Sequence, residues 1–533
     1  MKVVDTSSSA EKSSLVAQII AFVTTNFLLV AVLAIVGRCA YKRYASPLRN
    51  VPGPWLASVS RLWKVWSTYN GHTELDHIAL HKKYGRPQFY PVIDNVIYQG
   101  LGPVVRTAPN EISFGTCDAA KDIFAVGKGF HKTMFYSVFP PKHAPDIFTE
   151  VRESKHAQMK RYAVVPYSLP QMQKRSEPIE NMIKLLMQKL ENYATDDKRL
   201  CNLGNLLHYF AFDVLGEVAF SRQFGFLEKE IDIEGSIKNI DDVQWYDGIV
   251  GHIAEYDILL RNNPLRAYLP KKFQMQPTTM TKIAVAELEK RKQKDGTFDS
   301  QGIDLLAELL RNHEGNAEKF SINDVFSIAH GAVFAGSDST ASTMQSFFYL
   351  VLNAPKVYER LSQEVKEAHE AGQLSEIVTY AEAQALPYFQ ACLKEAMRVR
   401  PAVGLGIYRR TPPEGVDIGG KHYPGGIEVA VNGWVLHRDK AIFGEDVEEF
   451  RPERWFEGDT KLKASHLYQF GGGAHLCIGR NLAIFEMNKT LIQILRKYDI
   501  TLAHPGRPLQ YHSTFFVVQE GLEAYLRKRS DKA

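Results

Sequence analysis

The sequence has few cysteines, and their placement excludes two classes of small stabilised domain. Only five occur in 533 residues. They are odd in number, lie far apart and form no Cys-x-x-Cys pair, which excludes a disulfide framework and a zinc module. The pattern fits a reducing compartment that faces the cytosol. The five residues are Cys39, Cys117, Cys201, Cys392 and Cys477.

Net charge is also small. Lysine and arginine number 64, and aspartate and glutamate number 60, which leaves a formal charge of +4 at pH 7. A nucleic-acid-binding surface needs a larger basic excess, so we expect no nucleic acid partner. The sequence further lacks a Walker phosphate loop, a Gly-x-Gly-x-x-Gly dinucleotide fingerprint and spare length for a flavin domain. Its hydrophobic content of 45% is ample for a large core.

A long apolar run lies near the amino terminus. Residues 15–37 carry no charged side chain and are long enough for a helix that spans a bilayer. A cleaved signal peptide is the alternative, but the run is long for one and no small-residue cleavage site precedes Arg38. Basic residues follow the run, so the positive-inside rule places the carboxyl-terminal part in the cytosol. The sequence therefore predicts a single-pass membrane anchor.

Prolines and a glycine divide this anchor from the rest of the chain. Pro47, Pro52, Gly53 and Pro54 break any helix and make a short, stiff connector. We predict an anchor at residues 1–46, a Pro/Gly hinge at 47–54 and a catalytic domain at 55–533.

Residues 470–479 carry the strongest chemical signature, Phe-Gly-Gly-Gly-Ala-His-Leu-Cys-Ile-Gly. The glycines let the backbone turn tightly and approach a flat, bulky group. Apolar residues at helical spacing follow Gly479, so Cys477 lies just before a helix amino terminus, where the macrodipole favours a thiolate. A single sulfur on such a loop suits the axial position of a haem iron. Considered alone, a lone cysteine is more often a small buried hydrophobic residue.

This stretch resembles the haem-ligand loop of the cytochrome P450 family, Phe-Gly-x-Gly-x-Arg-x-Cys-x-Gly. Every fixed position matches except the arginine, which is His475 here. The resemblance implies a mainly α-helical fold with small β-sheets around a buried haem b. It further implies that Cys477 is the axial iron ligand, that Phe470 contacts the haem, and that His475 binds a haem propionate.

A long helix is predicted from the capping residue Ser321. Residues 335–340, Ala-Gly-Ser-Asp-Ser-Thr, interrupt its apolar face with a glycine and four polar residues, at a cost in stability. The interruption resembles the oxygen-binding motif of the family, Ala-Gly-x-Asp/Glu-Thr-Thr, in a widened helix. It implies that Asp338 is the proton-donating acid, that Ser339 replaces the first threonine and that Thr340 matches the second. Considered alone, the same pattern indicates only a kinked helix whose hydroxyls are hydrogen-bonded within the protein.

Basic residues elsewhere resemble further propionate contacts of the family. Lys160 and Arg161 stand where the third helix of the family carries an arginine, and His156 replaces the usual tryptophan. Arg409 follows an apolar stretch that resembles the strand running over the haem. Without the resemblance, Lys160 and Arg161 are simply a solvated basic face.

A structural triad of the family is also matched. Glu395 and Arg398 are three residues apart, on one face of a predicted helix, and Arg454 follows in Phe-Arg-Pro-Glu-Arg-Trp. The resemblance implies that these three residues hold the core around the haem. Alone, Glu395 and Arg398 would be an ordinary surface ion pair.

Four motifs therefore occur in the order of the family, most like fungal microsomal members related to pisatin demethylase and benzoate hydroxylase. The resemblance implies a monooxygenase that inserts one atom of O2 into a small hydrophobic substrate of secondary metabolism, such as a terpenoid, polyketide or aromatic. Protons would pass through Asp338 and Ser339 or Thr340. Because the sequence holds no nucleotide site or flavin domain, electrons are expected from NADPH through a separate cytochrome reductase. The microsomal likeness places the anchor in the endoplasmic reticulum membrane, in contact with lipid.

Two alternatives stay open. A haem-thiolate isomerase or dehydratase shares the fold without activating O2, and Ser339 is compatible with it. A non-catalytic membrane-anchored haem binder is the other, although the complete proton-delivery stretch argues against it.

Residues 86–102 separate two segments, Lys-Tyr-Gly and Pro-Val-Val-Arg, that family members join directly. The inserted stretch is apolar for a surface loop and has no helical start signal. We predict either a membrane-facing loop near the anchor or an in-frame retained intron, and favour the intron because its flanks would join without a gap.

Overall fold

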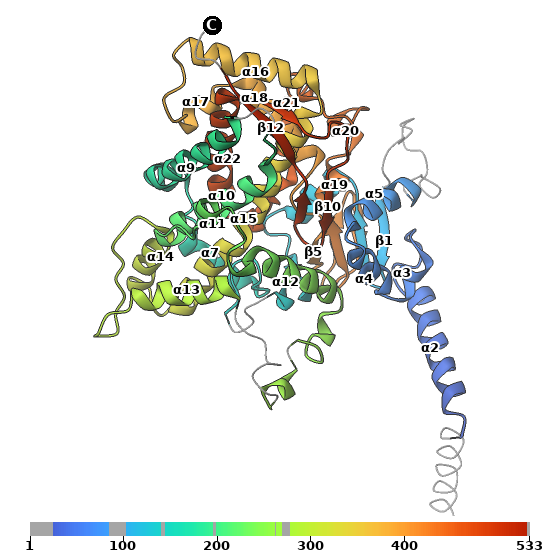
Figure 1. Ribbon diagram of the computed structural model, residues 1–533. Coiled ribbons are helices and arrows are strands. Elements are labelled where there is room, and N and C mark those ends of the chain that lie inside the picture. Colours follow the sequence, from blue (N-terminus) through green and yellow to red (C-terminus); the bar gives the residue numbers. More distant parts are fainter. Residues whose placement is uncertain are drawn as a thin grey trace, which may run out of the picture.

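The fold was obtained as a computed structural model, which describes residues 25–84, 103–139, 144–195, 199–261, 263–268 and 278–529. Helices form most of the body, and the strands gather on the side from which helix α2 (Phe27–Tyr44) extends (Figure 1).

The other α-helices are α3 (Trp55–Val59), α4 (Leu62–Tyr69), α5 (Thr73–Tyr84), α6 (Cys117–Phe124), α7 (Glu153–Ala163), α8 (Leu169–Lys174), α9 (Ser176–Ala194), α10 (Leu203–Phe220), α11 (Phe226–Lys229), α12 (Ser236–Val250), α13 (Thr279–Lys290), α14 (Leu305–Glu314), α15 (Ile322–Leu352), α16 (Pro355–Glu370), α17 (Tyr380–Gln384), α18 (Pro387–Val399), α19 (Gly433–Leu436), α20 (Lys440–Phe443), α21 (Thr460–Ser465) and α22 (Arg480–Lys497). Short 3₁₀ helices are η1 (Met134–Val138), η2 (Ile233–Gly235), η3 (Gly251–Tyr256), η4 (Pro264–Tyr268), η6 (Pro452–Phe456), η7 (Tyr468–Phe470) and η8 (Gly473–His475).

The strands are β1 (Val104–Ala108), β2 (Glu111–Phe114), β3 (His131–Lys132), β4 (Cys201–Asn202), β5 (Ile407–Arg410), β6 (Val416–Ile418), β7 (Lys421–Tyr423), β8 (Glu428–Val431), β9 (Tyr498–Leu502), β10 (Gln510–Ser513), β11 (Val517–Glu520) and β12 (Glu523–Lys528). The largest sheet has the order β1-β2-β8-β5-β3, in which only β2 and β8 run parallel. A second sheet has the order β4-β12-β9, and β6-β7 and β10-β11 are hairpins.

Helix α15 is the centre of the fold. It starts at a capping box, in which the Ser321 side chain accepts from the Asp324 N–H and the Asp324 side chain accepts from the Ser321 N–H. The helices that pack on it are α10, α13, α14, α16, α18 and α22. Because these helices come from distant parts of the sequence, α15 holds the whole helical body together.

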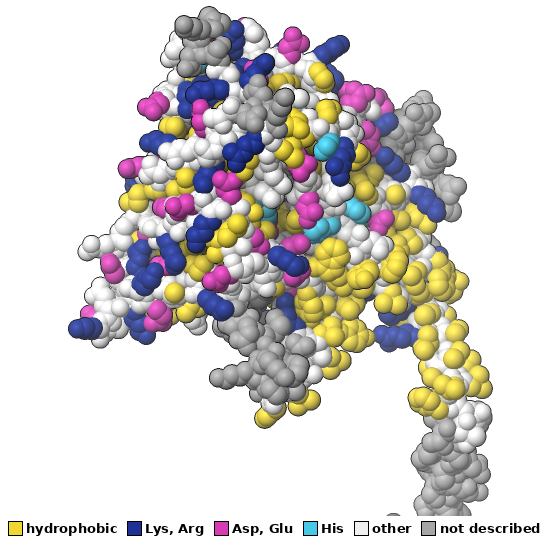
Figure 2. All heavy atoms as spheres, viewed as in Figure 1, with side chains coloured by type: hydrophobic (Ala, Val, Ile, Leu, Met, Phe, Trp, Pro, Cys, Tyr) yellow, Lys and Arg dark blue, Asp and Glu magenta, His cyan; other side chains and the backbone are white. Residues whose placement is uncertain are grey.

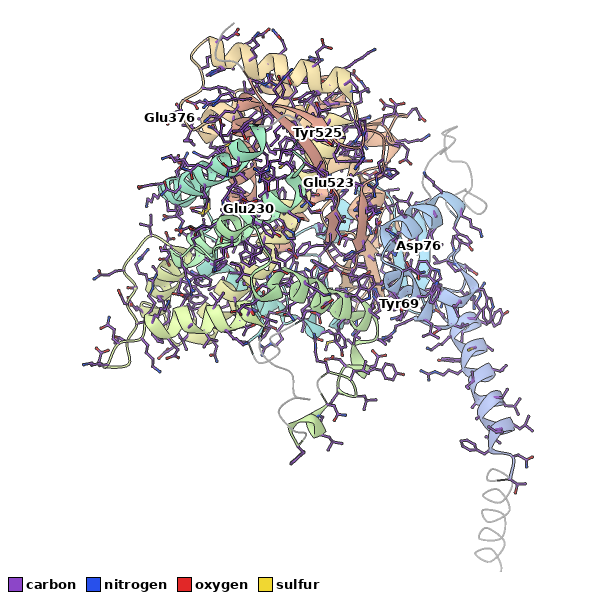
Figure 3. All side chains as sticks on the ribbon, in the orientation of Figure 1. Tyr69, Asp76, Glu230, Glu376, Glu523 and Tyr525 are labelled. Atoms are coloured by element: carbon purple, nitrogen blue, oxygen red, sulfur yellow. The ribbon has the colours of Figure 1, made fainter. Side chains whose placement is uncertain are left out.

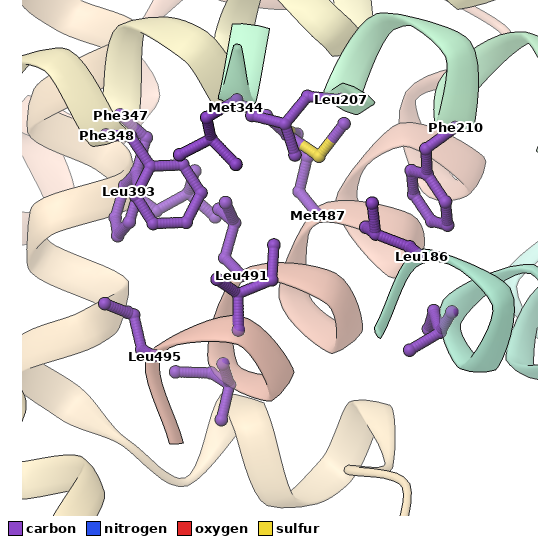
Figure 4. Close-up of a cluster of buried hydrophobic side chains, with 14 of the residues drawn as sticks. Leu186, Leu207, Phe210, Met344, Phe347, Phe348, Leu393, Met487, Leu491 and Leu495 are labelled. Carbon is purple, nitrogen blue, oxygen red and sulfur yellow. The ribbon is translucent and has the colours of Figure 1, made fainter. Parts of the chain in front are cut away.

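The largest hydrophobic core lies where α9, α10, α15, α18 and α22 meet (Figure 4). Phe210 from α10, Phe347 from α15 and Leu491 from α22 are all completely buried in it. In Figure 3, Tyr69 and Asp76 lie on the side of α2, whereas Glu376 lies at the opposite end of the molecule. The helical core thus separates these two ends.

The amino-terminal helix differs from its predicted bounds. Of the predicted anchor at 15–37, residues 15–24 lie outside the described residues, and α2 continues past Gly37 to Tyr44. Arg38, Lys42 and Arg43 are therefore inside the helix rather than after it. Over the part of the chain that the structure describes, no helix is both long enough and apolar enough to cross a membrane.

The predicted hinge packs on the body. The Arg106 N–H donates to the carbonyl of Pro52 at 2.7 Å, and a Cβ at Gly53 would lie 2.3 Å from the carbonyl oxygen of Arg106. A glycine is therefore needed at this close approach. The predicted insertion at residues 86–102 lies outside the described residues.

Candidate functional site

A cavity of about 300 Å³ lies between α15, the 470–479 loop and the strand β5. Its wall is mainly apolar, and the turn between β10 and β11 contributes part of it. Apolar lining residues are Phe139, Phe148, Leu215, Ile328, Phe334, Val403, Leu405, Phe515 and Phe516. Cys477, Ser339, Thr340 and Arg409, all predicted site residues, border this same cavity.

The cysteine loop is held by its own backbone and by glycine. The Cys477 N–H donates to the carbonyl of Phe470 at 2.9 Å, which closes the loop just before α22. Gly473 has a φ of +58°, and a Cβ there would lie 1.7 Å from the carbonyl oxygen of Phe124. No other residue fits this position, so the glycine brings the loop tightly against α6.

The sulfur of Cys477 faces the cavity. Burial raises the pKa of its thiol, while the backbone N–H groups of Gly479 and Arg480 and the Lys160 cation act to lower it. All five cysteines are among the described residues, and only Cys477 borders the cavity. Cys201, for comparison, is buried, and burial raises its pKa to about 12. Cys477 is therefore the one thiol placed to bind a metal in the cavity.

His475 takes part in a cluster with an acid and a second histidine at the cavity edge. Its Nε2 lies 3.1 Å from a Glu153 carboxylate oxygen, and its ring lies 4.3 Å from the His156 ring. Burial acts to raise the pKa of Glu153, but the hydrogen bond to His475, the His475 charge and the Lys132 N–H together outweigh it and lower the pKa to about 2. His475 Nδ1 is buried and has no hydrogen-bond partner among the described residues.

Two further cations border the cavity. Arg409 donates to the Tyr136 hydroxyl at 3.0 Å and to the carbonyl of Tyr408 at 2.7 Å. Lys132, which the sequence analysis did not identify, is buried beside it, and burial together with the Arg409 charge lowers its pKa to about 7. Cations crowded in this way favour a bound anion.

Helix α7 corresponds to the third helix of the family and carries Lys160 and Arg161, the two basic residues predicted to contact a haem propionate. Lys160 Nζ donates to the carbonyls of Ala474 and Leu476 at 2.7 and 2.9 Å, so it braces the outer side of the cysteine loop. Arg161 is exposed. Neither residue is among those that border the cavity, although His156, one turn earlier on α7, is. The propionate contact of Lys160 and Arg161 stays a prediction.

Opposite the cysteine, α15 carries the predicted oxygen-binding residues. The helix is α-helical without a break from Ile322 to Leu352, so the predicted widening is not seen. The Ser339 hydroxyl donates to the carbonyl of Ala335 at 2.9 Å, and the Thr343 hydroxyl donates to the carbonyl of Ser339 at 2.8 Å. The hydroxyls thus bond back along the helix, as polar residues inside a helix commonly do.

Asp338 is buried and points away from the cavity wall. One carboxylate oxygen lies 2.8 Å from Nε2 of His208 on α10, and the other accepts from Nε2 of Gln244 on α12 at 2.7 Å. Gln244 also accepts from the N–H of Phe516 at 3.3 Å, so the acid is connected to a residue of the cavity wall. Sequence reasoning missed both partners because they lie 130 and 94 residues away.

The predicted triad is brought together behind the cysteine loop. Arg398 donates two hydrogen bonds to the Glu395 carboxylate, at 2.8 and 3.0 Å, and Arg454 donates a third at 3.1 Å. All three side chains are 0% exposed. Trp455 Nε1 donates to the same carboxylate at 2.9 Å, a partner that the sequence analysis did not assign.

His437 connects this triad to the cysteine loop. Its Nδ1 lies 3.2 Å from the carbonyl of Arg398, and its Nε2 accepts from the N–H of Tyr468 at 2.9 Å. Since Tyr468 begins the 3₁₀ turn before the loop, the triad fixes where the loop starts.

The cavity residues fit a haem. A glycine-shaped loop offers one cysteine sulfur, and the Arg409 and Lys132 cations match the charge of propionates. His475 Nδ1, which has no partner among the described residues, lies at the same cavity. The apolar wall suits the faces of a macrocycle and an organic substrate.

Comparisons with known proteins agree with this fit. A sequence profile described as Cytochrome P450 matches residues 115–525. The chain is 31% identical over 491 residues to the cytochrome P450 monooxygenase cicH of Emericella nidulans, covering 91% of this chain and 94% of that protein. It is 28% identical over 488 residues to a pisatin demethylase of Fusarium vanettenii, covering 90% and 89%. It is 32% identical over 497 residues to the cytochrome P450 monooxygenase hepC of Aspergillus oryzae, covering 88% and 91%.

The family profile spans most of the chain, and its members use a haem, an external electron donor, O2 and a small organic substrate. The chain belongs to the cytochrome P450 family and is a P450 monooxygenase of the fungal type.

Proposed function

We propose that this monooxygenase inserts one oxygen atom from O2 into a small hydrophobic molecule of secondary metabolism, using haem b and electrons from NADPH through a separate cytochrome reductase. The observation that carries the proposal is the placement of Cys477 across one apolar cavity from Ser339 and Thr340. The similarity to fungal P450 monooxygenases and to a pisatin demethylase supports a small organic substrate.

In this proposal the haem, when bound, supplies the oxidising chemistry, and the chain supplies its ligands. Cys477 would supply the thiolate that binds the iron. His475 and Arg409 would bind propionates, with Lys132 beside them, and Phe470 would contact the haem. Lys160 holds the loop carbonyls, which keeps the sulfur directed into the cavity.

Proton supply runs through Asp338. His208 is 15% exposed, so it can take a proton from solvent and pass it to the Asp338 oxygen 2.8 Å away. Since both oxygens of Asp338 are held outside the cavity wall, the carboxylate must release one partner and rotate before it can serve the Ser339 or Thr340 hydroxyl. We expect the hydrogen bond from Gln244 to break, because Asp338 then keeps its contact with His208, the proton source.

A second candidate, a haem-thiolate isomerase or dehydratase, is favoured by one observation. Ser339 replaces threonine, and its hydroxyl donates to the Ala335 carbonyl rather than into the cavity. Purified holoenzyme with a reductase decides between the two. Consumption of NADPH and O2 with a hydroxylated product supports the monooxygenase, whereas product formation without either co-substrate supports the second candidate.

For localisation we propose a single-pass anchor in the endoplasmic reticulum membrane, with the catalytic domain in the cytosol and lipid as a partner. Hydrophobic side chains of α3 and α4 gather beside α2 (Figure 2), and Trp55 and Trp66 are 66% and 64% exposed. Exposed aromatic residues of this kind suit a membrane interface. Fractionation of the full chain, with alkaline carbonate extraction, tests whether it is an integral membrane protein.

A further inference from the structure

The loop that follows η1 presents one acidic side chain to the cavity. Lys132 Nζ donates to the carbonyls of Ile147, Phe148 and Glu150, at 2.7, 2.8 and 3.1 Å. The ammonium therefore holds these carbonyls to one side of the loop. Asp146, at the start of the same segment, borders the cavity.

The carboxylate of Asp146 is fixed by one oxygen only. Oδ1 accepts from the N–H and the hydroxyl of Thr149, at 2.8 and 2.9 Å, while the Asp146 N–H donates to the same hydroxyl at 2.8 Å. No residue within the described ranges donates a hydrogen bond to Oδ2. This turn orients the side chain and leaves the second oxygen available.

Helix α15 has a glycine where Oδ2 approaches it. A Cβ at Gly331 would lie 2.1 Å from Asp146 Oδ2, so any larger residue would displace the carboxylate. Gly331 also borders the cavity, one turn before Ala335 in the oxygen-binding stretch. The neighbouring His330 is engaged elsewhere, since its Nε2 lies 2.9 Å from the Thr281 hydroxyl.

The Lys132 charge acts on the Asp146 carboxylate, but its hydrogen bonds go to the three carbonyls. An anionic oxygen in a largely apolar wall still needs a hydrogen-bond donor as its partner. We propose that Asp146 is a substrate-binding residue and that the substrate carries a hydrogen-bond-donating or cationic group, a hydroxyl or a protonated or quaternary amine, which binds Oδ2. This inference rests on the proposed function and narrows the substrate from any small hydrophobic molecule to one with a polar end.

Equilibrium binding to the holoenzyme tests this without turnover. Benzyltrimethylammonium is compared with neopentylbenzene, which has the same shape without the charge, and 4-butylphenol is compared with butylbenzene, which lacks the hydroxyl. A difference in affinity within the first pair shows that Asp146 binds a cation. A difference within the second pair shows that it binds a neutral hydrogen-bond donor. Asp146→Asn keeps an acceptor for Thr149 while removing the charge. Asp122→Asn, at an acid outside the cavity wall whose side chain is 31% exposed, is the control for net charge.

We expect Asp146→Asn to weaken binding of at least one polar probe by about tenfold or more, and to change both hydrocarbons and the Asp122→Asn control by less than about twofold. The proposal is overturned if wild type and Asp146→Asn bind both polar probes with equal affinity. It is also overturned if Asp146→Asn loses as much affinity for the hydrocarbons as for the polar probes. If Asp146→Asn does not retain haem, Gly331→Ala, which displaces the same carboxylate, is used with the same probes and the same criteria. Oxygen uptake is scored separately, so failure of the monooxygenase proposal is distinguishable from failure of this one.

Discussion

Two buried polar networks lie on opposite sides of the cavity and differ in how they are satisfied. Behind the cysteine loop, the Glu395 carboxylate receives hydrogen bonds from two arginines, Trp455 Nε1 and the Arg451 N–H, and its side chain is 0% exposed. On the α15 side, Asp338 has two side-chain partners, and one of them, His208, reaches solvent. A fully satisfied network fixes geometry, whereas a network with few partners and a path to water can exchange protons.

We call the fully satisfied network around Glu395 the closed network. Removing Glu395, its centre, should have the largest effect on stability and haem content. Glu395→Ala leaves Arg398 and Arg454 buried without their shared carboxylate, which typically costs about 3 to 5 kcal/mol of stability. We expect haem-free or aggregated protein, measured as haem content per chain after purification. Glu457→Ala, at an ion pair with an exposed side chain, is the matched control and should load haem normally. Normal haem content with slow turnover in Glu395→Ala would assign the triad to chemistry instead.

The closed network should also be sensitive to acid through His437. Burial, followed by the Arg398 charge, lowers its pKa to about 3 from the ordinary 6.5. Between these values the unfolded chain binds more protons than the folded one, so stability is complete above pH 6.5 and declines as the pH falls toward 3. At about 1.4 kcal/mol per pKa unit, the loss amounts to several kcal/mol.

Thermal unfolding from pH 7 to pH 4 measures this dependence. His437→Gln can still bond both neighbours but does not titrate, so its stability should fall less steeply in that range. His77 and His156, whose pKa values are also lowered to about 3, and His252, whose pKa is lowered well below 6.5, add to the slope, as do carboxyls such as Glu153, whose pKa is lowered to about 2. If the stability of His437→Gln falls as steeply with pH as that of wild type, His437 does not contribute to the acid sensitivity.

The network of Asp338, His208 and Gln244, which reaches water, is the open network. Changes in it should affect turnover rather than folding. Asp338→Asn keeps acceptors and shape but cannot transfer a proton, so we expect turnover to fall about 100-fold with normal haem content. His208→Gln retains a donor to Asp338 but cannot pass on a proton, and should slow turnover less. Unchanged turnover in both variants would show that protons arrive by another route.

The smallest effect is expected at the hydroxyls. Ser339→Ala should divert reducing equivalents to hydrogen peroxide, because it removes a polar group from the cavity wall beside Asp338. Peroxide formed per NADPH consumed is the measurement, with Thr340→Ala as the companion variant. If Thr340→Ala uncouples the enzyme and Ser339→Ala does not, the motif alignment is off by one residue.

Local sequence signals predicted the parts of the site that depend on local geometry. The glycine loop around Cys477, the cap at Ser321 and the spacing of Glu395 and Arg398 each follow from backbone rules within a few residues, and the structure has all three.

The features that the sequence did not predict depend on packing between distant segments. His208 and Gln244 meet Asp338 only because α10 and α12 pack beside α15, and neither carries a local signal. Lys160 donates to the Ala474 and Leu476 carbonyls, two contacts that its position in a motif did not predict. Side-chain direction depends on helix orientation, which a motif does not specify.

We propose that the closed network holds the cysteine loop so that Cys477 can bind the haem iron. The direct test is the absorption spectrum of the reduced carbonyl complex of wild type and Cys477→Ala, with Cys201→Ala as the control for a buried thiol outside the cavity. Wild type and Cys201→Ala should show the red-shifted Soret band of a thiolate ligand, and Cys477→Ala should lose it. Retention of that band in Cys477→Ala would contradict the account.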